Sequence, residues 1–296
     1  MRTLITGILL TGLALAIPAC APAGEPDSRP GVVVTILPQA EFVEKVGGDR
    51  VKVTVMVPPG ASPHTYEPKP AQIKALAEAK MYAKVGSGVE FELVWMDKLM
   101  ATNRDMLVVD CSKGVELQEA VDGHESEAEE ARPHTRLDPH IWMSPLNARI
   151  MVQNIRDGLV AVDPANRHSY EQNCAAYLEE LAGIDREMRD GLSGVRNQRF
   201  MVYHPAFGYF AREYELDMIP IETEGKEPTA ASLARLIEQA KAQGITVIFV
   251  EPQFDPKSAG VIAEAIGGRV VFIDPLAEDY IGNLRLILSQ MLQTMQ

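Results

Sequence analysis

The sequence predicts an α/β fold in which two (β/α) lobes with mainly parallel sheets are joined by a long, rigid helix. First, short apolar runs of strand length alternate with helical patterns, and the alternation occurs twice along the chain. Second, one long amphipathic helix separates the two series. Third, the 296 residues exceed the size of roughly 250 residues at which a single core stops growing.

The composition is that of a globular protein with an acidic surface. The chain is 46% hydrophobic and 23% charged, and its formal net charge is −13. This charge disfavours binding to nucleic acid and to anionic lipid headgroups, and it favours cations as partners.

The first residues resemble an export signal. Arg2 is followed by the apolar, uncharged stretch LITGILLTGLALAIP and then by small residues, so residues 1–20 are expected to form a signal peptide. This stretch is shorter than the roughly 20 residues that a membrane-spanning helix needs, and no later run is long and uncharged enough to span a bilayer.

Cys20 is a candidate lipidation site. The sequence IPAC over residues 17–20 resembles a bacterial lipobox, in which the cysteine is acylated. Cleavage after the APA sequence of residues 21–23 is the alternative, and it would release a soluble protein. We favour lipid anchoring, with a tether over residues 21–30 and a periplasmic or cell-surface location.

The first lobe is predicted over residues 31–163. Its expected strands, rich in β-branched and apolar residues, are Val32–Ile36, Val51–Val57, Met81–Val85 and Met106–Asp110. Its expected helices are Gln39–Val46 and Ala71–Ala79.

A linking helix is predicted over residues 164–191. Asp163 provides an N-cap and Pro164 the first helical residue, and Gly191 is expected to end the helix. One apolar stripe runs between them: Tyr170, Cys174, Tyr177, Leu178, Leu181, Ile184 and Met188. A rod of about 28 residues would span roughly 42 Å, so we expect limited closure of the lobes.

The second lobe is predicted over residues 192–296 and repeats the scheme of the first. Its expected strands are Arg199–Tyr203, Leu216–Ile221, Ile245–Val250 and Val270–Ile273. Its expected helices are Thr229–Ala242, Ser258–Ile266 and Asp279–Leu292.

Two further features allow more than one interpretation. Cys111 and Cys174 are expected to be buried thiols, although the sequence leaves a disulfide between them open. The acidic stretch of residues 116–130 is expected to be a solvated loop; the alternative is a collector of cations that uses His124 and His134.

Four side chains form a candidate metal site. His64, His140 and His204 each lie beside a proline, and Asp274 precedes Pro275. His204 and Asp274 directly follow predicted strands, and His64 lies in the loop after another. Ligands of open α/β sheets bind outside the carboxyl ends of the strands, so these groups are expected to meet in a cleft between the lobes.

Three imidazoles and one carboxylate suit a tetrahedral zinc site. Glu222 and Glu251 also follow strands, and either is a candidate substitute ligand or acceptor of an imidazole N–H. Three aromatic residues are expected either to wall the site against water or to pack between the lobes: Trp142, Phe207 and Tyr209. His168 is expected on the polar face of the linking helix.

The motifs SPHTYEPKP, LDPHIWMSP, YHPAFGYFA, GKEPTAASL and EPQFDPKSAGVIAEAIGG…IDPLAEDY occur in this order along the chain. Together they resemble the metal-specific solute-binding proteins of bacterial ABC transporters. The resemblance implies a zinc or manganese ion held between two lobes and handed to a membrane permease. Its metal ligands fall on His64, His140, His204 and Asp274.

The resemblance favours Zn²⁺ over Mn²⁺ as the transported ion. Members regarded as manganese-specific tend to carry glutamate where this chain has His204, and imidazole suits zinc better than manganese. A manganese carrier of the same family stays the alternative. We expect a monomer that binds a divalent metal ion and a permease.

Two other function classes are open to test. A zinc hydrolase would need an open fourth position and a base such as Glu67 or Glu222, but Asp274 would fill that position and no H-E-x-x-H or G-x-S-x-G motif occurs. A surface adhesin would use the metal only for structure, and loss of the metal would unfold it. We therefore expect a carrier that is not an enzyme.

Overall fold

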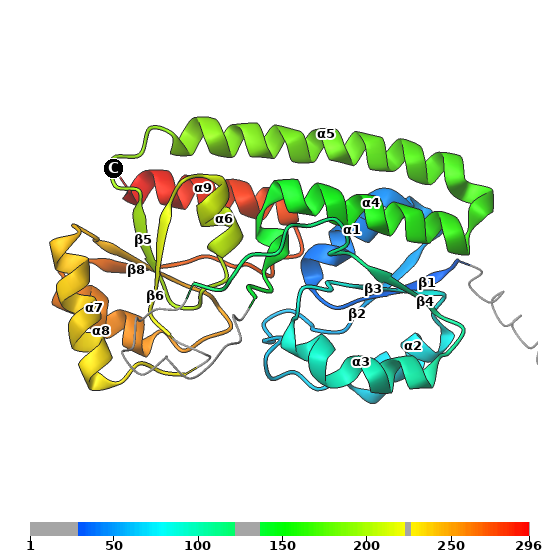
Figure 1. Cartoon of the computed structure of the whole chain (residues 1–296), viewed down its shortest axis with the longest axis horizontal. Coiled ribbons are helices and arrows are strands. Elements are labelled where there is room, and N and C mark those ends of the chain that lie inside the picture. The colour runs from blue at the N-terminus through cyan, green and yellow to red at the C-terminus, as the bar shows by residue number, and fades with distance from the viewer. Residues whose placement is uncertain (1–28, 122–136, 223–225, 296) are drawn as a thin grey trace, which may run out of the picture.

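The computed structural model describes residues 29–121, 137–222 and 226–295. It contains two four-stranded sheets in which all strand pairs are parallel, with helices packed around each sheet (Figure 1). The predicted α/β fold with two lobes and a long connecting helix is confirmed.

The first sheet has the order β2-β1-β3-β4. Its strands are β1 (Gly31–Val34), β2 (Lys52–Val55), β3 (Met81–Lys84) and β4 (Leu107–Asp110). In the register of the sheet, Val33 pairs with Thr54 on one side and Tyr82 on the other. The helices of this half are α1 (Leu37–Gly47), α2 (Pro70–Glu78) and α3 (Glu90–Thr102), with a 3₁₀ turn η1 (Gly48–Arg50).

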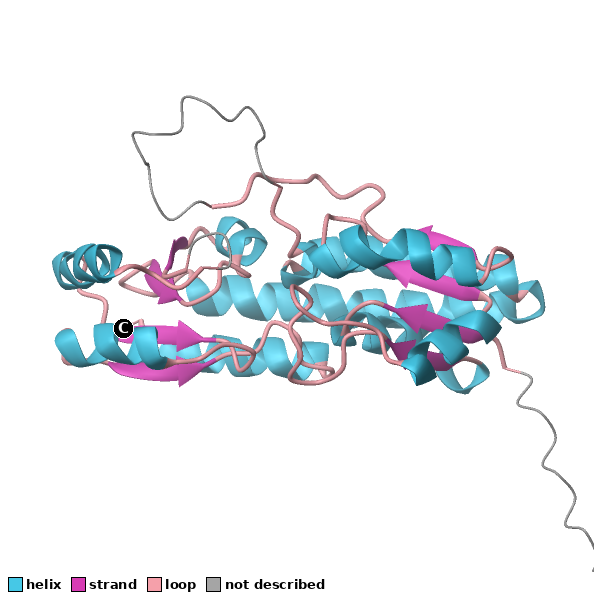
Figure 2. Ribbon diagram, turned by 90° about the horizontal axis from the view of Figure 1, so that it is seen from below, coloured by secondary structure: helices cyan, strands magenta, loops and turns pink. Residues whose placement is uncertain are grey.

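The second sheet repeats this order as β6-β5-β7-β8. Its strands are β5 (Arg199–Val202), β6 (Asp217–Pro220), β7 (Val247–Val250) and β8 (Arg269–Phe272). Its helices are α6 (Gly208–Glu213), α7 (Ala230–Ala242), α8 (Lys257–Ala265) and α9 (Tyr280–Thr294). In Figure 2 the arrowheads of the two sheets point toward the middle of the molecule, so the carboxyl ends of both sheets face each other there.

Two helices connect the lobes: α4 (Pro145–Val162) and α5 (Arg167–Leu192). Helix α5 runs along both halves of the molecule and packs against α1 and α4 at one end and α9 at the other (Figure 1). It begins three residues later than predicted, because Pro164–Asn166 form a 3₁₀ turn, η3. The carboxylate of Asp163 accepts hydrogen bonds from Tyr170 and Asn166 and so closes this turn.

Gly191 does not end the long helix, which continues to Leu192. A Cβ atom at Gly191 would lie 2.9 Å from the side chain of Leu288 in α9. The glycine therefore allows α5 to approach α9 closely, a packing role that the sequence prediction mistook for a helix stop.

The structure contains three helices that the sequence analysis did not predict: α3, α4 and α6. Helix α3 has no single apolar stripe, because Phe91 and Leu99 are buried while Leu93 and Val94 are exposed. Helix α4 does carry helix signals, since the hydroxyl of Ser144 caps it and proline is its first residue. A 3₁₀ turn, η2 (Ile141–Met143), precedes it.

The lobes are joined through side chains as well as through helices. The indole N–H of Trp142 donates to the carbonyl of Pro275 at 2.7 Å, and the hydroxyl of Tyr280 donates to the carbonyl of Trp142 at 2.7 Å. The rings of Phe42 and Tyr280 meet edge to face with centroids 4.9 Å apart. These contacts tie the segment after His140 to the segment after β8.

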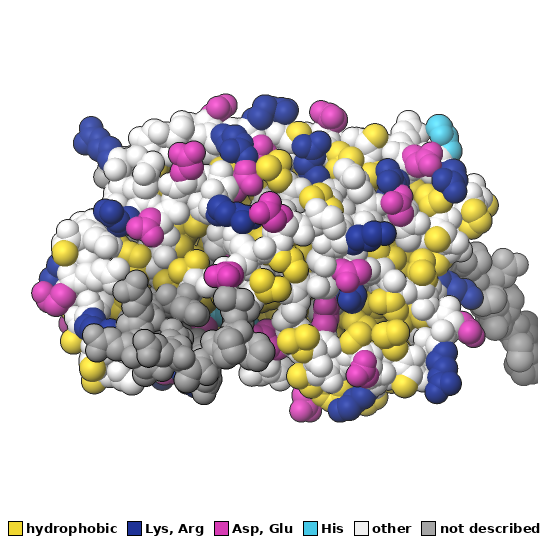
Figure 3. Space-filling view, in the orientation of Figure 1, with side chains coloured by type: hydrophobic (Ala, Val, Ile, Leu, Met, Phe, Trp, Pro, Cys, Tyr) yellow, Lys and Arg dark blue, Asp and Glu magenta, His cyan; other side chains and the backbone are white. Residues whose placement is uncertain are grey.

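Cys111 and Cys174 are buried, free thiols, as expected. None of the helices in the described ranges has both the length and the apolar character needed to cross a bilayer. Acidic and basic side chains alternate over α4 and α5 on the face shown in Figure 3. Cys20, His124 and His134 lie outside the described residues.

Candidate metal centre

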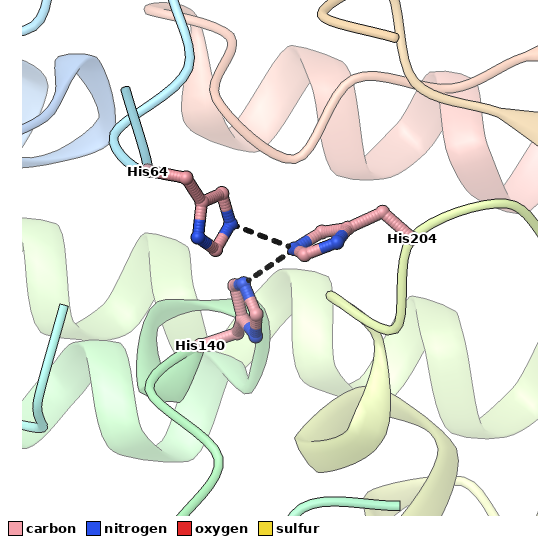
Figure 4. Close-up of side chains that lie close together, drawn as sticks. All are labelled: His64, His140 and His204. Carbon is pink, nitrogen blue, oxygen red and sulfur yellow. Dashed lines mark hydrogen bonds between the residues drawn. The ribbon is translucent and has the colours of Figure 1, made fainter. Parts of the chain in front are cut away.

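The three histidines predicted as metal ligands converge between the lobes (Figure 4). His64 lies in the loop between β2 and α2, His140 directly precedes the turn η2, and His204 follows β5. The three segments come from distant parts of the chain, and two of them, those of His64 and His204, follow the carboxyl ends of strands β2 and β5.

The ring nitrogens have the spacing of a metal site. The Nε2 atom of His204 lies 3.2 Å from Nε2 of His64 and 3.2 Å from Nε2 of His140. The three rings each offer one nitrogen, and these atoms all lie within 4.8 Å of one another. A tetrahedral zinc ion with ordinary Zn–N bonds would hold pairs of nitrogens about 3.3 Å apart.

Each histidine is held by a carboxylate at its other ring nitrogen. The Nδ1 atoms lie 3.0 Å from Glu90 for His64, 2.8 Å from Asp138 for His140, and 2.6 Å from Glu222 for His204. A neutral imidazole that donates Nδ1–H to a carboxylate has an unprotonated Nε2 atom. With all three rings in this tautomer, three lone pairs face one another and can bind one cation.

The protein environment keeps His204 neutral. Burial lowers the pKa of His204 to about 4, despite the hydrogen bond to Glu222. The ring of Phe254 stacks on His204 with centroids 4.8 Å apart, and the backbone N–H of His204 donates to Glu251 at 3.1 Å. Burial also raises the pKa of Glu251 well above its usual value.

His140 is fixed in a similar way. Its backbone N–H and its ring both lie in hydrogen-bond contact with the same carboxylate oxygen of Asp138. Burial alone would raise the pKa of Asp138, but the hydrogen bonds that it accepts from the ring and backbone of His140 and from Gln118 lower it. The ring of Trp142 lies 5.3 Å from that of His140.

The cavity at the histidines is small and is reached from one side. Its volume is about 20 Å³, room for one particle of the size of a water molecule. The side chains of His140 and His204 are 9% and 8% exposed, whereas that of His64 is 26% exposed. The site is therefore more accessible to solvent at His64 than at His140 and His204.

Asp274 is not part of the histidine cluster. Its Oδ1 atom accepts one hydrogen bond from Nε2 of Gln253 at 2.9 Å and another from the backbone N–H of Leu276 at 2.9 Å. Its role as fourth ligand stays a prediction.

The other candidate residues differ in whether they contact the cluster. Glu222 accepts an imidazole N–H, one of its two predicted roles, whereas Glu251 accepts a backbone N–H instead. Trp142 lines the cavity, while Phe207 and Tyr209 are buried elsewhere in the core. His168 is exposed on α5.

Four residues around the site were missed by sequence reasoning: Glu90, Asp138, Gln253 and Phe254. Asp138 had a usable signal, since a carboxylate two residues before a histidine can bond both its backbone and its ring. The other three reach the site only through the tertiary fold.

Comparison with known proteins agrees with this geometry. The family described as ZnuA, "Zinc-uptake complex component A periplasmic", matches residues 32–294. The chain is 32% identical over 252 residues to the high-affinity zinc uptake system protein ZnuA of Bacillus subtilis, covering 83% of this chain and 78% of that protein. A crystal structure of ZnuA superimposes with a TM-score of 0.84 at 41% identity, covering 91% of this chain and 100% of that one.

A second relative is longer than this chain. The zinc-binding lipoprotein AdcA of Streptococcus pneumoniae is 30% identical over 311 residues, which cover 97% of this chain but 60% of the relative. The chain thus spans about 60% of the length of this relative. Since the family match extends over nearly all described residues of both lobes, the chain belongs to the ZnuA family of periplasmic zinc-uptake components.

Proposed function

We propose that the chain is the extracytoplasmic solute-binding component of a metal ABC transporter. It captures one Zn²⁺ ion with His64, His140, His204 and Asp274 and delivers the ion to a membrane permease. The observation that carries the proposal is the convergence of three Nε2 atoms whose rings are each held at Nδ1 by a carboxylate.

Zinc is the proposed ion for two reasons. Imidazole nitrogens suit zinc, whereas carboxylate-rich sites suit manganese. The relatives are named as zinc-binding and zinc-uptake proteins. The carboxylates of Glu90, Asp138 and Glu222 contact the rings and are not needed as ligands, so the nitrogen character of the site is kept.

The cavity supports a carrier over an enzyme. Its volume of about 20 Å³ accepts an ion but no organic substrate beside it. Relatives in this family are named for uptake and binding and for no reaction. The adhesin alternative predicts that loss of metal unfolds the chain, whereas a carrier must survive as a folded apo form.

The location follows from the same proposal. The chain works outside the cytoplasm as a monomer, with Cys20 acylated and the lipid holding the folded lobes near the membrane that contains the permease. The name of the pneumococcal relative, a lipoprotein, supports this anchoring.

The capture step is tested by metal titration of protein freed of metal by chelation. Native mass spectrometry should show one Zn²⁺ per chain, and competition with a chelator should give a dissociation constant of about 1 nM or lower. Circular dichroism should show a folded apo form. Binding of Mn²⁺ more tightly than Zn²⁺ would overturn the choice of ion, and unfolding on chelation would overturn the carrier.

The delivery step is tested in the producing cell. Deletion of the gene should reduce growth in medium depleted of zinc by a chelator, and added zinc should restore growth. The parent chain should restore growth without added zinc, but a His204→Ala chain should not. If both chains restored growth equally, growth would not depend on zinc capture by the chain, and the proposal would be overturned.

A further inference from the structure

The loop that follows β7, residues Glu251–Asp255, contacts two of the proposed ligands at once. We refer to it as the β7 loop. Its residues Glu251 and Phe254 hold His204, through the hydrogen bond to the backbone N–H and the stacked ring. Its residue Gln253 holds Asp274 through the hydrogen bond of 2.9 Å. The β7 loop therefore sets the relative position of these two ligands.

Gln253 contacts Asp274 and also borders the space where the ion would bind. Gln253 lines the small cavity together with the three histidines, whereas Asp274 is not among the lining residues. Both hydrogen bonds to Oδ1 of Asp274, from Gln253 and from the backbone of Leu276, hold the carboxylate outside the cluster. Asp274 must therefore shift to reach an ion.

The amide of Gln253 is bonded at one end only. Its Oε1 atom is buried and has no hydrogen-bond partner within the described ranges. A reversed amide would direct this oxygen at the carboxylate of Asp274, which is unfavourable, so the contact with Asp274 fixes the orientation of the amide. If Asp274 moves away, the Nε2 donor loses this partner as well, and leaving a buried donor unpaired costs free energy.

We propose that Gln253 is a positioning residue that weakens zinc binding by holding Asp274 back from the ion. The inference rests on the proposed function, because it takes Asp274 as the fourth ligand. Asp274 brings its Oδ1 atom to the three histidines only by exchanging the Gln253 amide for the metal, so part of the binding free energy is then used to break that bond. Because Asp274 can return to its hydrogen bond with Gln253, it can leave the ion without losing a partner. This exchange gives the site a route to release the ion.

The first test removes the amide and keeps the volume. A Gln253→Leu variant cannot hold Asp274, so it should bind zinc about tenfold more tightly than the parent, as expected for one hydrogen bond to a charged group. Competition with a chromophoric chelator measures the affinity. Gln239→Leu on the exposed face of α7 is the matched control and should leave the affinity unchanged.

The second test asks whether Gln253 acts through Asp274. In an Asp274→Asn background, which keeps an acceptor for the N–H of Leu276, the Gln253→Leu change should have no effect on zinc affinity. Thermal unfolding of the zinc-free variants checks their folding. The absorption spectrum of bound Co²⁺ should change with Asp274→Asn and should stay that of the parent with Gln253→Leu.

Each other outcome overturns a defined statement. If Gln253→Leu binds zinc with unchanged or weaker affinity, or has the same effect in both backgrounds, the role of Gln253 is wrong. If Asp274→Asn alone leaves the affinity unchanged while His204→Ala abolishes binding, Asp274 is not a ligand, and the role of Gln253 falls with it. The three-histidine carrier survives both results, and among these binding measurements it is overturned if His204→Ala binds zinc like the parent.

Discussion

His204 and His64 use the same chemistry in different surroundings. Both offer Nε2 to the cluster and donate Nδ1–H to a glutamate. The His204–Glu222 pair is nearly buried, with side chains 8% and 3% exposed, whereas the His64–Glu90 pair is 26% and 24% exposed. One side of the site is thus built into the core of the second lobe, and the other side is open to solvent.

This difference separates two tasks of a carrier. The buried pair is fixed during folding, so little ordering free energy is lost when the ion binds there. The more exposed pair can exchange its contacts with water, so under the proposed function we expect the ion to enter along that edge. We expect changes on the buried side to affect affinity and stability together, and changes on the open side to affect binding with little effect on stability.

The largest expected effect comes from removing an imidazole on each side. His204→Ala and His64→Ala should each weaken zinc binding by on the order of a thousandfold, because a ligand is lost. Only His204→Ala should also destabilise the zinc-free protein, by about 2 kcal/mol, since it leaves the buried carboxylate of Glu222 without its donor. Calorimetric titration measures the first effect and urea unfolding the second. Equal unfolding free energies for the two variants would contradict the proposed difference between the buried His204 side and the more exposed His64 side.

The second expected effect is a pH dependence of the free energy of unfolding, which arises from His204 on the buried side of the site. The pKa of His204 falls from 6.5 to about 4 on folding, so between these values the unfolded chain binds a proton that the folded chain does not. Stability from this group is fully present above pH 6.5 and is lost as the pH falls toward 4, by roughly 3 kcal/mol in total.

Urea unfolding of the zinc-free protein at pH 7 and pH 4.5 tests this dependence against a His204→Gln variant. The variant should lose clearly less stability than the parent over this interval. Glu251 contributes with the opposite sign, because its pKa is raised, but it is present in both chains and its effect cancels in the difference. Parallel losses in parent and variant would show that His204 titrates normally.

The fold was predictable where one residue pattern sufficed. Strands β1 and β7 are continuous runs of Val, Ile and Phe, and such runs indicate buried parallel strands whatever surrounds them. Helix α3 was missed because Leu93 and Val94 are apolar yet exposed, so that periodicity alone does not show which face is buried. Gly191 was misread because its purpose is contact with Leu288, nearly a hundred residues away.

The convergence of three histidines was predictable, whereas the residues that hold them were less so. The prolines beside His64, His140 and His204 mark stiff segments, and this signal is local. His64 and His204 also follow strands, whereas His140 follows a long loop and could not be placed from the strand pattern. Glu90 and Gln253 carry no such mark, since a glutamate at a helix start and a glutamine in a loop are common at surfaces. Their contacts arise only when separate elements pack together.

The buried carboxylate itself gives a smaller effect than its histidine. Glu222→Gln keeps an oxygen that can accept the hydrogen bond from Nδ1–H of His204. It removes the negative charge that makes the Nε2 lone pair of His204 a stronger ligand for the metal. Changes of this kind cost about 10- to 100-fold in metal affinity. Chelator competition measures the loss, with Glu264→Gln on α8 as a control that should bind zinc like the parent. If Glu222→Gln binds zinc with the affinity of the parent, the hydrogen bond to His204 is sufficient for full affinity and the charge of Glu222 is not needed.

The smallest effect is expected from the matching change on the open side. Glu90→Gln should weaken zinc binding only about threefold, because water near this partly exposed pair screens the lost charge and can replace part of the contact. The same loss of charge lies beside the entrance, so zinc capture measured by stopped flow should slow at low salt, and the difference from the parent should shrink as salt is added. If Glu90→Gln weakens binding as much as Glu222→Gln, then exposure does not separate the two sides, and the division of tasks between them is wrong.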